Sequence, residues 1–133
     1  MIYTLFVFNS WMDFALRIVV AFIFIAHGWP KLKNLNNTCK NFSAMGFSPG
    51  KLWGTMISVL EAVGGALLLI GFGTQILGIL FAAEMAVAAA WKIRRGEKMI
   101  GGYEFDLILF AASLILATSG GGMYGLDSYF RIW

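Results

Sequence analysis

Four apolar stretches, each long enough to cross a lipid bilayer, dominate this sequence of 133 residues. They cover approximately residues 11–29, 52–72, 75–92 and 103–119. A helix needs about 20 apolar residues to span a hydrocarbon core about 30 Å thick. Because unpaired backbone polar groups are not tolerated in lipid, we expect each stretch to be an α-helix. The short connections between the later stretches predict an all-α, up-and-down bundle of four transmembrane helices, with residues 1–133 as a single membrane domain.

The composition agrees with a membrane environment. Apolar and aromatic residues make up 59% of the chain and charged residues only 13%, about half the usual charged share of a soluble domain. The mean hydropathy is +0.77, and a soluble domain this small could not bury so many apolar side chains in one core. The segment 2–8 is also apolar and is suited to lie along the membrane interface.

The basic residues define the expected orientation. The first connection contains Lys31, Lys33, Lys40 and Lys51, and the third contains Lys92, Arg94, Arg95 and Lys98. The second connection has neither lysine nor arginine. By the positive-inside rule, both basic loops face the cytoplasm and both termini lie on the opposite side of a cell membrane. The net charge of +3 is divided between these loops instead of covering one face, so we exclude nucleic acid as a partner and expect membrane lipids.

Three charged residues interrupt the predicted spans: Arg17 in the first, Glu61 in the second and Glu84 in the third. A charge at the centre of a membrane helix costs about 2.5–3.5 kcal/mol. We therefore expect Arg17, Glu61 and Glu84 to form one cluster inside the bundle. Gly64 and Gly65 follow Glu61 on the same helix face, which favours close packing there. Such a cluster can serve function, or it can serve only to fix the packing of the helices.

His27 is the only histidine and lies close in depth to Glu104 at the start of the fourth span, which predicts a second polar patch. We expect Glu104, Asp106 and Asp13 to be span-end residues in contact with headgroups or water. One histidine and one cysteine exclude a bis-histidine haem, a di-iron site and a cysteine-rich metal site, so we predict no metal. The remaining groups suit proton exchange, or recognition of the carbonyl and hydroxyl groups of a lipid-soluble quinone.

The order and spacing of several motifs resemble the DoxX family of small four-helix membrane proteins. The motifs are Arg17, then FIAHGWPKL at residues 24–32, EAVGG at 61–65, GYE at 102–104 and GGGMYGLD at 120–127. The resemblance implies membrane-linked redox roles: quinone-reducing thiosulfate oxidation, terminal oxidase complexes, and a membrane complex with sulfurtransferase and superoxide dismutase partners. It covers most of the chain.

Carried onto this chain, the resemblance implies the same polar residues that we selected from their chemistry, and it adds Lys31 and Tyr103 as supporting donors. The candidate catalytic residues are Glu61, Glu84 and His27, and the candidate ligand-binding residues are Arg17, Lys31, Tyr103 and Glu104. The expected ligand is a quinone, with no covalent cofactor. The expected partners are soluble redox or sulfurtransferase proteins at the cytoplasmic loops, and further copies of the chain.

Three functional hypotheses follow from these residues. The first is a redox-associated subunit that binds a quinone or a similar lipophilic carrier within the bundle. The second is a non-catalytic membrane anchor whose basic loops dock soluble partners or anionic lipid. The third is a pathway for protons or small solutes through the carboxylates. No site for an electron-carrying cofactor is visible in the sequence, which favours a subunit over an enzyme that acts alone.

Overall fold

The computed structural model describes residues 8–130, and within that range every regular element is a helix. The elements are α2 (Asn9–Lys33), α3 (Leu35–Ala44), α4 (Gly50–Val59), η1 (Leu60–Gly64), α5 (Gly65–Ile70), α6 (Thr74–Arg94), η2 (Met99–Tyr103), α7 (Glu104–Ser119) and α8 (Leu126–Tyr129). The η1 element is a π-helical turn, whereas η2 contains a kink with non-helical backbone angles at Ile100 and Gly101. The predicted all-α fold is confirmed.

Four helical segments have the length and hydropathy to cross a membrane, as predicted. They are Asn9–Lys33, Gly50–Ile70, Thr74–Arg94 and Met99–Ser119. The predicted end of the first span before Pro30 is wrong, because α2 continues through this proline to Lys33. Proline has no N–H to donate within the helix and crowds the preceding turn, but the Pro30 carbonyl still accepts a hydrogen bond from the Asn34 N–H at 3.1 Å.

The first connection contains a helix that the sequence analysis did not predict. This helix, α3, is mostly polar and packs against α4. The hydropathy pattern that located the spans could not reveal it, because only its Thr38 is buried. The apolar segment expected ahead of the first span lies, apart from Phe8, outside the described residues.

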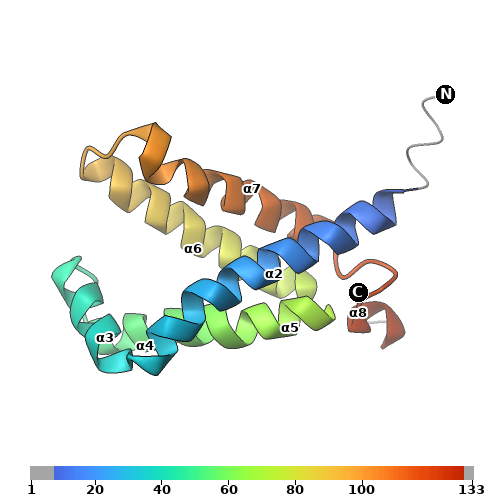
Figure 1. Cartoon of the computed structure of the whole chain (residues 1–133), viewed down its shortest axis with the longest axis horizontal. Coiled ribbons are helices and arrows are strands. Elements are labelled where there is room, and N and C mark those ends of the chain that lie inside the picture. The colour runs from blue at the N-terminus through green and yellow to red at the C-terminus, as the bar shows by residue number, and fades with distance from the viewer. Residues whose placement is uncertain (1–7, 131–133) are drawn as a thin grey trace.

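The spans form two antiparallel hairpins (Figure 1). In the first hairpin α2 packs along α4, η1 and α5, and in the second α6 packs along α7. The start of α2, the α5–α6 turn and α8 gather at one end of the molecule, and α3 and the α6–α7 connection lie at the other. We call the latter the basic end, because it carries the basic residues that close α2 and α6: Lys31, Lys33, Lys92 and Arg94.

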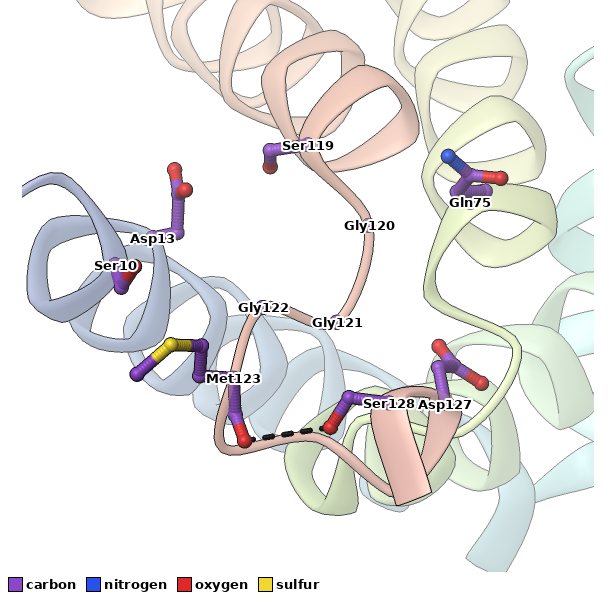
Figure 2. Close-up of a pocket in the computed structure, with 10 residues that line it drawn as sticks. All are labelled: Ser10, Asp13, Gln75, Ser119, Gly120, Gly121, Gly122, Met123, Asp127 and Ser128. Atoms are coloured by element: carbon purple, nitrogen blue, oxygen red, sulfur yellow. Dashed lines mark hydrogen bonds between the residues drawn. The ribbon is translucent and has the colours of Figure 1, made fainter. Parts of the chain in front are cut away.

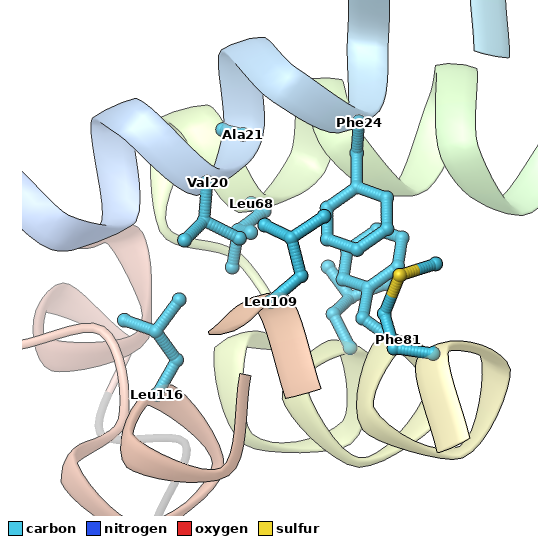
Figure 3. Close-up of a cluster of buried hydrophobic side chains, with 9 residues drawn as sticks. Val20, Ala21, Phe24, Leu68, Phe81, Leu109 and Leu116 are labelled. Carbon is cyan, nitrogen blue, oxygen red and sulfur yellow. The ribbon is translucent and has the colours of Figure 1, made fainter. Parts of the chain in front are cut away.

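An apolar core joins the two hairpins (Figure 3). Its centre is a stack of Phe24 from α2 on Phe81 from α6, with ring centroids 3.8 Å apart and planes 14° apart. Val20, Leu68 and Leu116 belong to the same core and are at most 2% exposed. Lipid tails are as apolar as this core, so the association of the hairpins depends on close packing and on polar contacts. The polar contacts therefore carry much of the structural and chemical specificity.

Candidate functional site

Glu61, Glu84 and Lys31 meet between the two hairpins, and we call these three residues the acid site. Lys31 Nζ donates a hydrogen bond of 2.7 Å to Glu61 Oε1. The Glu84 carboxyl group lies close to the Glu61 carboxyl group. The Glu61 side chain is only 4% exposed, whereas that of Lys31 is 34% exposed. The site thus combines two carboxyl groups from different hairpins with one ammonium group.

The two carboxyl groups have unused hydrogen-bonding capacity. Glu61 Oε2 and Glu84 Oε2 are both buried, and neither accepts a hydrogen bond from a donor among the described residues. Two ionised carboxylates in contact repel each other. The geometry therefore suits one proton held between Glu61 and Glu84, with Lys31 balancing the remaining negative charge.

Two backbone features bring Glu61 and Lys31 together. Glu61 lies in the π-helical turn η1, a distortion that often occurs at functional sites. Gly28 faces this turn so closely that a Cβ atom there would lie 2.4 Å from the Ala62 nitrogen and 2.5 Å from Glu61 Cβ. Lys31 follows Gly28 by one turn of α2, so its side chain reaches the carboxylate.

Arg17 does not join the acid site, and the predicted cluster of Arg17, Glu61 and Glu84 is wrong in this respect. The Arg17 guanidinium donates hydrogen bonds to the backbone carbonyls of Gly121 and Tyr124, the second at 3.1 Å. Because α2 runs antiparallel to the second span, Arg17 lies beside Gly71. Ten residues of helix separate that level from Glu61, which is roughly 15 Å.

The buried Arg17 belongs to a polar cap at the end of the bundle opposite the basic end. Asp127 accepts hydrogen bonds from the backbone N–H groups of Gly73 at 2.7 Å and Thr74 at 2.8 Å. These groups lie at the start of α6, where a carboxylate is favoured by the unpaired N–H groups of the helix. The Asp127 carboxylate also attracts the Arg17 guanidinium. The segment after the fourth span therefore ties this end together.

A polar pocket of about 360 Å³ lies beside the cap (Figure 2). Its lining residues are Ser10, Asp13, Gln75, Ser119, Gly120, Gly121, Gly122, Met123, Asp127 and Ser128. Neither carboxyl group of the acid site lines it, so the pocket and the acid site are separate features. Within residues 8–130, no group of three or more His, Cys, Asp and Glu side chains is arranged to hold a metal ion.

The second polar patch expected from His27 and Glu104 is not formed by a hydrogen bond between them. His27 is exposed and lies against the Phe105 ring, with centroids 5.9 Å apart. Glu104 Oε1 instead accepts a hydrogen bond of 2.9 Å from the Gly101 N–H at the start of α7. Tyr103, at the end of η2, is half-buried.

Asp106 forms an ion pair that the sequence analysis missed. It was expected to contact headgroups or water, but it is only 6% exposed, and its Oδ2 lies 2.8 Å from Lys92 Nζ. The pair joins α7 to α6 near the basic end. The signal was available, because antiparallel helices with a short connection place Lys92 and Asp106 at similar depth, but both residues were assigned to the membrane boundary.

The spans that contain the acid site match a known family. The DoxX family model matches residues 12–93, which include Arg17, Lys31, Glu61 and Glu84. The chain belongs to the DoxX family. This DoxX protein is 30% identical over 114 residues to "Putative oxidoreductase CatD" of Bacillus subtilis (strain 168), with 86% of this chain and 83% of CatD covered.

A second relative comes from Escherichia coli (strain K12). Its name is "Inner membrane protein YphA", and it is 29% identical over 119 residues, with 84% of each chain covered. No solved structure matches this DoxX protein significantly. Family membership and the four apolar helices together identify a multi-pass membrane protein whose surroundings are membrane lipids.

Proposed function

We propose that this DoxX protein is a redox-associated membrane subunit that binds a quinone or a similar lipophilic carrier at the acid site. The observation that carries the proposal is the carboxyl pair of Glu61 and Glu84, buried between the hairpins with Lys31 on Glu61. Reduction of a quinone consumes protons, and buried acids next to a carrier can exchange them. The name of the relative CatD contains the word oxidoreductase, which supports a redox role.

The three residues of the acid site have different proposed roles. Glu84 exchanges the proton, because no lysine or arginine among the described residues forms an ion pair with it. Glu61 holds the shared proton in place, and Lys31 fixes Glu61 and offers N–H groups to a carbonyl oxygen of the carrier. The proposal needs no covalent cofactor. Electrons are proposed to come from a partner protein, since the sequence shows no motif for an electron-carrying cofactor.

His27, Tyr103 and Glu104 are proposed to contribute at the basic end. His27 lies on the flank of α2 that faces Phe105, where an apolar carrier can enter from the lipid. Tyr103 and Glu104 lie where the second hairpin begins its last span. In contrast, Arg17 is proposed to stabilise the polar cap and to take no part in carrier binding.

Retention and binding of a quinone test the proposal directly. The protein is purified in a mild detergent, its bound lipophilic molecules are identified by mass spectrometry, and a short-chain quinone is then titrated. We expect wild type to bind and Glu61→Gln to lose most of the binding. Glu97→Gln is the matched control, because Glu97 is exposed in the α6–α7 connection. Absence of bound quinone, or equal binding by Glu61→Gln and wild type, contradicts the proposal.

An anchoring role is the second candidate, favoured by Arg94 and Arg95, which are both exposed at the basic end. In this proposal the basic loops face the cytoplasm and dock an acidic surface of a soluble redox or sulfurtransferase protein. Charge reversal of Arg94 and Arg95 should abolish recovery of that partner in a pull-down, whereas Glu61→Gln should not. Lys92 must stay unchanged in this test, because it pairs with Asp106.

A further inference from the structure

We infer that the acid site exchanges protons with the basic end of the membrane protein only, through Lys31, and that the stacked rings of Phe24 and Phe81 seal it from the opposite end. The inference deepens the proposed function and rests on it, because the proposed carrier uses the exchanged protons. In the exchange step, a hydronium ion at the basic end gives a proton to the carboxylate pair and becomes water. The reverse step returns the proton to water.

Lys31 provides a polar connection from the acid site to the basic end. Gly28 is at the level of Glu61, and Lys31 lies one turn further along α2 toward the basic end. About a third of the Lys31 side chain is exposed, whereas the Glu61 side chain it binds is almost completely buried. The ion pair therefore reaches from a buried carboxylate to the surface on this side.

The opposite side of the acid site is closed by aromatic rings. Phe24 precedes Gly28 by one turn of α2, and Phe81 precedes Glu84 by about one turn of α6. The two rings stack at 3.8 Å and are 1% and 0% exposed. Phe81 also packs on Gly64, one turn beyond Glu61, where a Cβ atom would lie 3.3 Å from the ring. Three helices thus present tightly packed apolar groups at one level.

No titratable side chain bridges this seal within the described spans. Between the acid site and the polar cap, the segments 18–26, 62–70, 75–83 and 107–119 contain no Asp, Glu, His, Lys, Arg, Tyr or Cys. Charged groups on the elements packed around the acid site have other partners: Asp106 of α7 pairs with Lys92, and Arg17 binds the cap. Lys33 lies over the Trp29 ring, and Glu104 accepts a hydrogen bond from the Gly101 N–H. His27 faces Phe105. A proton therefore has a polar route at the basic end and none through Phe24 and Phe81.

Infrared spectroscopy after a pH change on one side of the membrane tests this inference without any carrier. The outcome of the experiment is therefore independent of quinone binding. The full chain is reconstituted in vesicles, and the fraction with outward-facing basic loops is measured by trypsin cleavage at the exposed Arg94 and Arg95. A rapid pH drop is applied outside, and the C=O band of protonated carboxyl groups is followed. Glu61→Gln and Glu84→Gln assign the band, and Glu97→Gln, at an exposed residue of the α6–α7 connection, is the matched control that should leave it unchanged.

We expect a fast rise of the band only in vesicles whose basic loops face the pH drop. Lys31→Met should slow that rise by about tenfold or more, and Lys31→Arg should restore much of it. If Lys31→Met fails to fold, Phe81→Ala provides a second test, because it should create a response from the opposite side. An equally fast response from both sides in wild type, a response only from the opposite side, or no response from either side overturns the inference.

Discussion

Gly28→Ala is the perturbation that tests the packing of the acid site most sharply. The added Cβ would lie 2.4 Å from the Ala62 nitrogen, whereas ordinary van der Waals contact begins at 3.4 Å. The neighbouring atoms are backbone and the first side-chain carbon of Glu61, so no flexible group can move aside. We therefore expect α2 to move away from η1 by about 1 Å. The hydrogen bond of 2.7 Å between Lys31 and Glu61 would then exceed its usual range.

Two opposing effects determine the stability change. Alanine is a better helix former than glycine and would stabilise a free helix position by about 0.5–1 kcal/mol. Overpacking costs about 1–3 kcal/mol, and the weakened hydrogen bond between charged groups costs about 1 kcal/mol more. The unfavourable terms exceed the favourable one. The predicted result is a net destabilisation of about 1–3 kcal/mol.

The single cysteine supplies the assay. Cys39 of α3 is partly buried, so a thiol-reactive fluorophore should report thermal unfolding of the protein in detergent. Gly102→Ala is the matched control, since a Cβ there meets nothing closer than 3.5 Å. Gly28→Ala should lower the unfolding midpoint by several degrees, and Gly102→Ala should leave it unchanged or raise it. A midpoint for Gly28→Ala at or above that of wild type would refute the packing argument.

Three further perturbations address the contacts outside the acid site. Asp127→Ala removes the acceptor of two N–H groups at the start of α6 and leaves the buried Arg17 without its counter-charge. The protein should lose about 2 kcal/mol of stability, and the midpoint of thermal unfolding should fall. An unchanged midpoint would show that the cap is dispensable. Lys92→Met alone should destabilise the protein by about 1–3 kcal/mol, because it leaves the buried Asp106 without its ion-pair partner. The double variant Lys92→Met with Asp106→Asn should recover part of this loss. A double variant that is less stable than Lys92→Met would contradict the prediction. Phe81→Ala should destabilise the protein by about 3 kcal/mol, because it removes the stacked ring from the core. A measured loss of stability below about 1 kcal/mol would disprove this prediction.

The number and position of the spans were predictable, because long apolar runs admit few alternatives in a membrane chain. The sequence signal is weaker where polar and apolar residues mix. The helix α3 and the continuation of α2 through Pro30 depend on tertiary packing and on hydrogen bonds that the hydropathy pattern does not encode. The π-helical turn at Glu61 has no signature in the sequence.

The two acids of the candidate site were predicted correctly, but the cation that pairs with them was not. The free-energy cost of an unpaired carboxylate in lipid correctly indicated that Glu61 and Glu84 face the interior. This cost does not distinguish Arg17 from Lys31 as the partner of Glu61, since the choice depends on the stagger of α2 against the second span. The close contact at Gly28 sets this stagger, and it places Lys31 at Glu61.

A solid-state NMR distance between lysine Nζ and glutamate Cδ tests the central claim most directly. The protein is reconstituted in lipid with ¹⁵Nζ-lysine and ¹³Cδ-glutamate, and the dipolar coupling between the two labels is measured. The described residues form two ion pairs, and the other one involves aspartate, so this labelling selects Lys31 and Glu61. We predict a strong coupling that is lost in Lys31→Met and in Glu61→Gln but kept in Lys33→Met. A coupling that survives Lys31→Met, or its absence in wild type, would contradict the account of a lysine-bound acid pair inside the membrane.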